Sequence, residues 1–300
     1  MSLTLNLCTA ILPKFLYGDT VKIAVAAGYQ GIELRVDDHY HKSLEELSSR
    51  GASIRRKLDQ VGLRVPILNS YISVNNEHAI DLLLYCCQKM NIPKARIVLP
   101  RSCRASVSHQ ANVKAIIPSY EVNQKPEELI NELKKTLKRL EGKARQAGVK
   151  LLLELHWGTV MSSFTSAYLL TQDLDPDCIG ITFDPANMLV EGKEDWEFGL
   201  KLIRPYVANV HVKNVAWTST PKGWLWGWTT VMHGMVNWAE IISLLTQNQY
   251  QGDYAIEDFL TPSSSKPSAI NYLTWVRAEF EELHEHFGNI AASHLQDVAS

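Results

Sequence analysis

Acidic residues and one histidine stand directly after short apolar runs at four places in the second half of the chain. The residues are Glu154, Asp184, His211 and Glu257, which follow LLL, GITF, VANV and YAI. Burying a carboxylate is costly unless a partner or a metal ion compensates its charge. Three carboxylates and one neutral imidazole form an oxygen-rich ligand set that suits Mn²⁺, Mg²⁺ or Co²⁺, and zinc is a further candidate. We therefore predict that these residues hold one divalent metal ion.

Alone, each of these residues would more often form a salt bridge or cap a helix, so the prediction depends on their joint occurrence. Three further residues follow the same pattern and are candidates to contact a substrate. Glu33 ends an apolar run, and alternatively pairs with Arg35 or Lys213. His156 lies two residues beyond the LLLE run, where it would contact a substrate or orient a metal ligand. Lys213 would steady a developing oxyanion or form a salt bridge.

The elements that would position these residues alternate along the chain. Apolar runs predict strands at 3–8, 31–35, 64–69, 95–100, 150–154, 179–184, 207–213 and 252–257. Amphipathic stretches predict helices at 19–27, 43–60, 77–90, 126–147, 162–174, 196–203, 237–247 and 268–287. Strict alternation is typical of right-handed βαβ units, and eight such units can close into an α/β (β/α)8 TIM barrel. A doubly wound sheet is the alternative, but a glycine-rich dinucleotide-binding turn after the first strand is missing.

Length and composition favour one TIM barrel domain over residues 1–300. Three hundred residues would fit two average domains, but single barrels of this size are common and no low-complexity linker divides the chain. Two connections, 101–125 and 214–236, are unusually long, and both follow strands on the side where barrel enzymes place their sites. Residues from about 288 to 300 are expected to form a C-terminal tail.

The second long connection is dense in tryptophan, with Trp217, Trp224, Trp226 and Trp228. These rings would anchor the loop or form a subunit contact, which is consistent with a homo-oligomer. Alternatively, they would form a hydrophobic wall over a substrate that must be kept dry, so Trp217 is a candidate substrate contact. In the first long connection, Arg101, Arg104 and His109 would bind a substrate carboxylate or remain solvated surface.

Charge and cysteine content limit the partners and the compartment. Thirty basic and 32 acidic residues give a net charge of −2, and the missing basic excess argues against nucleic acid as the main partner. The hydrophobic fraction of 46% and the charged fraction of 21% exclude a disordered chain. No signal peptide and no uncharged apolar stretch of about 18 residues is found, so no membrane partner is expected. Five cysteines without a C-x-x-C pair predict a reduced, cytoplasmic protein.

Five motifs, in this order, resemble those of the xylose isomerase-like TIM barrels. They are GIELR, LLLELHWG, FDPANMLVEG, VHVKN and YAIEDF, and the resemblance covers nearly the whole chain. That superfamily includes sugar phosphate isomerases and epimerases, ketose 3-epimerases, inosose dehydratase and endonuclease IV. RPYVANVHVKN followed by GMVNWAEII is similar to the 3-dehydroshikimate dehydratase branch. The resemblance implies one divalent metal on Glu154, Asp184, His211 and Glu257, and Asn187, a candidate substrate contact, stands where some members have a histidine.

The resemblance and the predicted ligand set together predict a divalent-metal-dependent sugar or sugar phosphate isomerase or epimerase. The metal would polarise a carbonyl and an adjacent hydroxyl of a small polyhydroxylated substrate, and proton transfer would pass through a metal-bound enediolate. Glu154 and Glu257 would be catalytic, one removing a proton and the other returning it. A metal-dependent dehydratase of the 3-dehydroshikimate or inosose type shares the first half of this reaction, and nothing at the strand ends separates the two.

Two further classes of function fit the sequence less well. An enzyme of DNA repair similar to endonuclease IV needs several further histidines, but Asn69 ends the third strand and Val231 stands two residues before His233 in place of an aspartate. A non-catalytic, metal-stabilised binding barrel is disfavoured, because two buried glutamates at the site would lower its stability without serving a reaction.

Overall fold

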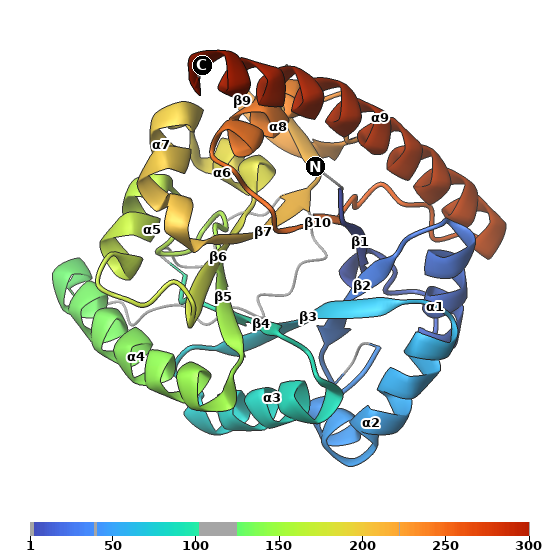
Figure 1. Cartoon of the computed structure of the whole chain (residues 1–300), viewed down its shortest axis with the longest axis vertical. Helices are drawn as coiled ribbons and strands as arrows, with labels where there is room; N and C mark the ends of the chain where they lie inside the picture. Colours follow the sequence, from blue (N-terminus) through green and yellow to red (C-terminus); the bar gives the residue numbers. More distant parts are fainter. Residues whose placement is uncertain (1–2, 39–40, 102–124, 222, 300) are drawn as a thin grey trace.

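The computed structural model describes residues 3–38, 41–101, 125–221 and 223–299. Eight parallel strands close into a barrel in the order β1-β10-β7-β6-β5-β4-β3-β2, and helices surround it (Figure 1). The barrel strands are β1 (Leu5–Cys8), β2 (Gly31–Val36), β3 (Arg64–Ser73), β4 (Lys94–Val98), β5 (Lys150–Glu154), β6 (Ile179–Phe183), β7 (Val207–Val212) and β10 (Asp253–Ile256). The predicted (β/α)8 barrel is thereby confirmed.

Nine α-helices lie within the described ranges. They are α1 (Tyr17–Ala26), α2 (Leu44–Gln60), α3 (Glu77–Met90), α4 (Pro126–Ala147), α5 (Phe164–Thr171), α6 (Pro185–Glu191), α7 (Trp196–Ile203), α8 (Trp238–Gln247) and α9 (Lys266–Ala299). Helix α4 follows its sequence pattern closely, because Pro126 occupies the first turn and the leucines at four-residue spacing are buried. It ends at Gly148, whose left-handed φ of 64° suits a residue without Cβ.

Helix α6 was not predicted, and it matters because it begins at a candidate metal ligand. Asp184 caps the helix, since its side chain accepts a hydrogen bond from the backbone nitrogen of Asn187, and Pro185 occupies the first turn. A helix of seven residues is too short to show amphipathic periodicity in the sequence. The cap fixes Asp184 at the carboxyl end of β6.

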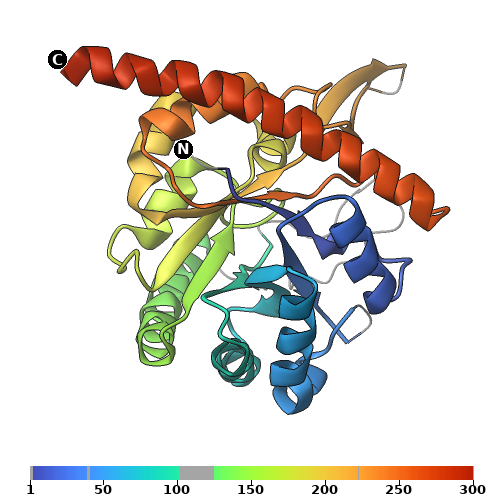
Figure 2. The same cartoon turned by 45° about the vertical axis from the view of Figure 1, so that its right-hand side comes forward.

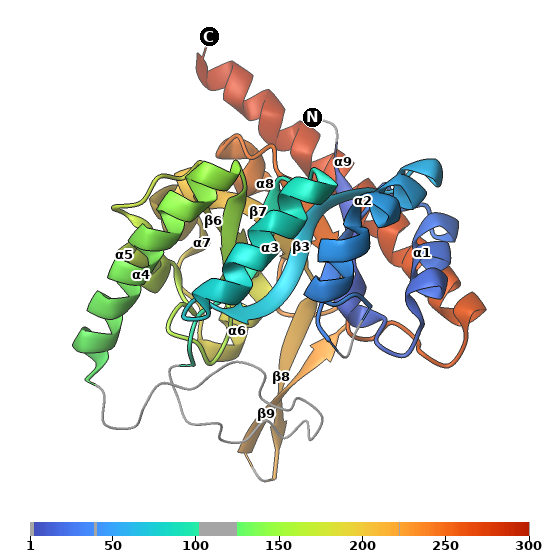
Figure 3. The same ribbon diagram turned by 90° about the horizontal axis from the view of Figure 1, so that it is seen from below.

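The long connection expected over 214–236 contains a β-hairpin. Strands β8 (Asn214–Thr220) and β9 (Gly223–Thr229) pair antiparallel from Asn214↔Thr229 to Thr220↔Gly223. Their aromatic and β-branched residues suit a ribbon of this kind. Figure 3 shows the hairpin projecting from the barrel at the end opposite the N-terminus. Of the other long connection, 101–125, residues 102–124 lie outside the described part of the chain, and with them Arg104 and His109.

The predicted end of the last helix at residue 287 is wrong, because α9 continues through the expected tail to Ala299. Gly288 does not end the helix, since it is not among the glycines with positive φ, and no proline or further glycine follows it in the chain. Figure 2 shows α9 extended along one side of the molecule. None of the described helices, α9 included, has the long apolar run that crossing a bilayer requires.

An aromatic cluster outside β6 joins α5 to α7. The rings of Phe164, Phe183 and Trp196 lie with their centroids 5.6–6.0 Å apart. Gly199 on α7 faces this cluster so closely that an added Cβ would lie 1.9 Å from a ring carbon of Phe164. The absence of a side chain at Gly199 therefore lets the two helices approach each other over β6.

Replacing Gly199 with alanine should lower the free energy of unfolding by about 1–3 kcal/mol, because the Phe164 ring must move in a packed core. The matched change Gly142→Ala in α4 places a Cβ with no atom within 4 Å and should raise that free energy by about 0.5–1 kcal/mol. Urea unfolding followed by circular dichroism measures both. Equal changes for the two variants would contradict the proposed packing.

Candidate metal centre

The four predicted metal ligands lie together at the carboxyl ends of four neighbouring strands. Glu154 and His211 belong to β5 and β7, while Asp184 and Glu257 directly follow β6 and β10. Each offers one ligand atom, and these atoms all lie within 4.8 Å of one another. All four residues are buried, with exposed fractions of 6% or less. The structure thus brings together residues that are far apart in the sequence.

The carboxylates of Glu154 and Asp184 each have one oxygen anchored by the protein and one directed toward the His211 ring. Glu154 Oε2 forms an ion pair with Arg96, and its Oε1 lies 3.1 Å from His211 Nδ1. Asp184 Oδ1 accepts a hydrogen bond of 2.9 Å from the backbone nitrogen of Asn187, and its Oδ2 lies 3.5 Å from His211 Nδ1. One oxygen of each carboxylate is therefore directed at a common centre.

Glu257 and His211 likewise each have one polar atom held by the protein and one directed toward the shared centre. The Cys8 thiol donates to Glu257 Oε1 at 3.5 Å, and Glu257 Oε2 lies 3.4 Å from His211 Nδ1. On the other side of the ring, His211 Nε2 donates to Glu33 Oε2 at 3.0 Å. This contact would leave the lone pair of a neutral imidazole on Nδ1, facing the three carboxylates. Three oxygens and one nitrogen so arranged fit a hard divalent cation.

The ionisation of the cluster reflects these neighbours. Burial alone would raise the pKa of Glu154 and of Glu257, but neighbouring cations hold both well below their usual range. For Glu154 the main cation is Arg96, and for Glu257 it is Lys213. His211 contributes next to both. Burial alone would lower the pKa of His211, but Glu257 and the other carboxylates raise it well above its usual value. The carboxylates of the metal-free cluster are therefore ionised and favour a protonated His211.

Lys213 lies inside this cluster and contacts two of its carboxylates. Its Nζ is 2.7 Å from Asp184 Oδ2 and 2.6 Å from Glu257 Oε2. It also lies 5.0 and 5.3 Å from the ring centroids of Trp228 and Phe259. Burial would lower the pKa of Lys213, but Asp184 and then Glu257 raise it, so the side chain is a cation.

Glu33 lies behind His211 and does not direct an oxygen at the centre of the cluster. Its Oε1 accepts a hydrogen bond of 2.6 Å from Asn209, and its Oε2 accepts one of 3.2 Å from Asn69 as well as the one from His211. The residue is 1% exposed. This placement favours a role in orienting His211 over the substrate contact expected from the sequence.

Asn187 is completely buried beside the inward-facing oxygens. Its Nδ2 donates to Asp184 Oδ2 at 2.9 Å, to Glu154 Oε1 at 3.1 Å and to the carbonyl of Leu155 at 3.2 Å. Its Oδ1 has no hydrogen-bond partner within the described part of the chain. A buried acceptor without a partner is uncommon, and one beside a ligand cluster fits a site that a bound group completes.

His156 lies at the end of β5, half-buried, with a neutral ring. Its Nδ1 is 2.7 Å from the carbonyl oxygen of Trp157, to which it donates. Burial is the main reason why the pKa of His156 is lowered. Nε2 is then the acceptor atom of the ring.

A row of aromatic rings extends from His156 to the far side of the cluster. Successive ring centroids are 5.5, 5.3, 5.1 and 5.3 Å apart along His156, Trp157, Trp226, Trp228 and Phe259. We call these five residues the aromatic row. Trp217 is not among them, because its indole N–H donates to the carbonyl of Leu189 and ties β8 to α6. Trp224 is 67% exposed near the hairpin turn.

Several polar residues that organise the cluster were missed in the sequence. Arg96, Asn69, Asn209 and Cys8 are all buried and contact a ligand or Glu33. For Asn209 the signal is the polar residue at every second position of VANVHVK, which turns Asn209, His211 and Lys213 to the same face. Arg101 is one of the residues suggested to bind a substrate carboxylate. Its backbone pairs with that of Thr159 in an isolated antiparallel β-bridge.

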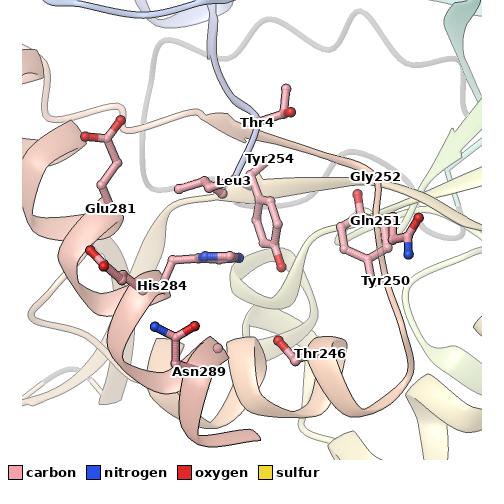
Figure 4. A pocket seen from close by; sticks show the side chains of 12 residues that line it. Leu3, Thr4, Thr246, Tyr250, Gln251, Gly252, Tyr254, Glu281, His284 and Asn289 are labelled. Carbon is pink, nitrogen blue, oxygen red and sulfur yellow. The ribbon is translucent and has the colours of Figure 1, made fainter. Parts of the chain in front are cut away.

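Two described cavities, of about 640 and 650 Å³, open at the opposite end of the barrel, where the strands begin. The first lies between α8, α9 and the start of β10, and Tyr250, Tyr254 and His284 line it (Figure 4). The second lies beside Lys94 and Lys150. Neither is lined by a predicted site residue.

Comparison with known proteins establishes the family. The sequence model of the xylose isomerase-like TIM barrel matches residues 21–279. The chain belongs to this family. The resemblance carried by the five strand-end motifs is thereby confirmed. Among curated proteins, none matches the sequence of this xylose isomerase-like barrel.

Solved structures with a similar fold share few residues with this xylose isomerase-like barrel. The IolI protein with a bound zinc atom is 17% identical, with a TM-score of 0.70 over 94% of this chain and 99% of that one. The probable 3-DHS dehydratase AsbF of Bacillus anthracis is 18% identical, with a TM-score of 0.65 over 92% and 99%. The 3-keto-D-glucoside 4-epimerase YcjR of E. coli is 14% identical, with a TM-score of 0.66 over 92% and 100%. At these identities, the similarity to the three structures concerns the fold alone.

The contact between Glu33 and His211 predicts an effect on metal binding. Glu33→Gln should weaken Mn²⁺ binding by about 10- to 100-fold, because the carboxylate that orients the imidazole and raises its basicity is lost. Isothermal titration calorimetry measures the affinity. Glu141→Gln is a matched control, since Glu141 is likewise buried, at 3% exposed, but pairs with Lys138 and Arg145 on α4. Unchanged Mn²⁺ affinity in the Glu33 variant would contradict the orienting role.

Proposed function

We propose that this xylose isomerase-like barrel is a divalent-metal-dependent isomerase or epimerase of small polyhydroxylated substrates, namely sugars or sugar phosphates. The observation that carries the proposal is the set of four atoms directed at a common centre, each from a residue whose other polar atom is anchored. Two of these residues, Glu154 and Glu257, stand at the two ends of the arc formed by β5, β6, β7 and β10. A solved structure of the same fold is an epimerase.

The metal ion would be held through Glu154 Oε1, Asp184 Oδ2, His211 Nδ1 and Glu257 Oε2. When bound, a divalent ion supplies Lewis-acid polarisation of a carbonyl and of the oxygen next to it, which acidifies the neighbouring C–H bond. The oxygen-rich set favours Mn²⁺, Mg²⁺ or Co²⁺, and the structure of IolI with zinc keeps zinc a candidate.

The two glutamates would move the proton. In the metal-free protein Arg96 lowers the pKa of Glu154 and Lys213 lowers that of Glu257, so both carboxylates are ionised, as a proton acceptor must be. Because they stand at opposite ends of the arc, one would remove the proton and the other would return one from a different side. Epimerisation by proton transfer uses such a pair, because the proton must return to the opposite face of the same carbon.

His156 and the aromatic row would bind the remainder of the substrate. His156 Nε2 is suited to accept a hydrogen bond from a substrate hydroxyl, since the ring is neutral and its Nδ1 is already used. Trp157 and Trp226 of the aromatic row would present apolar faces to the C–H groups of a sugar and exclude water from the proton-transfer step. We propose no substrate contact for the indole N–H of Trp217, which is committed to Leu189.

A screen of ketoses, inososes and 3-dehydroshikimate with Mn²⁺ or Mg²⁺ should find a substrate that exchanges a carbon-bound proton with D₂O. NMR measures the exchange, and ultraviolet absorbance measures any enone or aromatic product. Glu154→Gln and Glu257→Gln should each lower the exchange rate by at least about 100-fold, because a proton acceptor and a charged metal ligand are lost together. Chelation of the metal should abolish exchange in the wild-type protein.

The matched control is Glu128→Gln, whose side chain is 57% exposed on α4 and should leave the exchange rate unchanged. Full activity in both glutamate variants of the cluster would refute the proposed mechanism. Formation of an absorbing product with loss of water would assign the dehydratase reaction to the same residues.

A further inference from the structure

Lys213 competes for the oxygen atoms that the proposed function gives to the metal. Its ammonium lies 2.7 Å from Asp184 Oδ2 and 2.6 Å from Glu257 Oε2. These are the inward-facing oxygens, and both also face His211 Nδ1. An ammonium and a divalent ion cannot both occupy the shared centre at these distances, since each carries positive charge and needs the same lone pairs.

The contrast with Arg96 shows that this arrangement is not required to neutralise a buried carboxylate. Arg96 pairs with Glu154 through Oε2, the anchored oxygen, and leaves Oε1 directed at the centre. A metal at Oε1 is therefore compatible with the Arg96 ion pair. Lys213, in contrast, contacts only inward-facing oxygens of its two carboxylates.

A second favourable position for the Lys213 ammonium lies next to the one between the two carboxylates. The ring centroids of Trp228 and Phe259 are 5.0 and 5.3 Å from Lys213 Nζ, and the two rings stack on each other at 5.3 Å. Aromatic faces at this distance attract a cation. The four-carbon stem of lysine is flexible, so a small movement would take the ammonium from the oxygens toward these rings.

We propose that Lys213 is a displaceable counter-ion of the metal centre. It neutralises Asp184 and Glu257 in the metal-free protein and moves toward Trp228 and Phe259 when a divalent ion binds. The inference rests on the proposed function, since it takes the four-residue cluster as the metal centre. Lys213 then stabilises the metal-free barrel and weakens metal binding.

The test is calorimetric titration of Mn²⁺ into the wild-type protein and the variants Lys213→Met, Lys213→Gln and Lys94→Met. Both Lys213 variants should bind Mn²⁺ at least about tenfold more tightly, because binding no longer breaks two ion pairs beside a retained positive charge. Lys94→Met should bind like the wild type, since Lys94 pairs with Asp253 at the other end of the barrel. Thermal unfolding with and without Mn²⁺ provides a second readout, in which Mn²⁺ should stabilise the Lys213 variants more than the wild type.

A variant that folds only with Mn²⁺ present would also support the proposal, because the metal then replaces the missing counter-ion; its affinity is measured by competition with a chelator. Equal or weaker Mn²⁺ affinity in both Lys213 variants, or failure of both to fold even with Mn²⁺, would overturn it. If the wild-type protein itself binds no Mn²⁺, the proposed metal centre fails. If the wild type binds it and the Lys213 variants bind no tighter, only the role of Lys213 fails.

Discussion

The burial of four carboxylates at one end of the barrel is the constraint on which the rest of the site depends. They are Glu33, Glu154, Asp184 and Glu257, each 6% exposed or less. Removing such charges from water costs several kcal/mol for each ion unless cations and hydrogen-bond donors compensate it. Arg96 and Lys213 pair with members of the set, and a protonated His211 offsets a third negative charge in the metal-free protein. One divalent ion beside a neutral His211 would balance the cluster.

The same constraint explains why the interior of this barrel is polar. The anchoring donors come from different elements: Arg96 from β4, the Cys8 thiol from β1 and the backbone nitrogen of Asn187 from α6. Because each donor fixes one atom of a ligand, the other atom has a defined direction before any ion arrives. Such preorganisation lets a metal site select an ion by charge and geometry. The layer below it, where Asn209 and Asn69 bind Glu33, supports His211 in the same way.

Much of this arrangement could be predicted from the sequence, because the ligands end apolar strands and the strands alternate with helices. Strand ends are visible in a sequence, and barrel closure then brings them together. Arg96 could not be found in that way, since it lies in the middle of β4 and reaches Glu154 through the pairing of β4 with β5. Cys8 does end β1, but its contact with Glu257 depends on the pairing of β1 with β10 from the other end of the chain. Helix α6 is too short to show a period. The tryptophans of 214–236 do not alternate with polar residues in a way that distinguishes the hairpin of β8 and β9 from a loop. The role of Lys213 depends on distances of a few ångströms to two carboxylates, and the spacing of residues along the sequence cannot specify such distances.

The central claim is that the four inward-facing atoms form one divalent-metal site, and anomalous scattering tests it most directly. Crystals of the chain grown with Mn²⁺, with data collected at the manganese absorption edge, would locate the ion. The account predicts one strong peak about 2.0–2.3 Å from Glu154 Oε1, Asp184 Oδ2, His211 Nδ1 and Glu257 Oε2. No peak at this position, or a strong peak elsewhere while the cluster keeps its ion pairs, would contradict it.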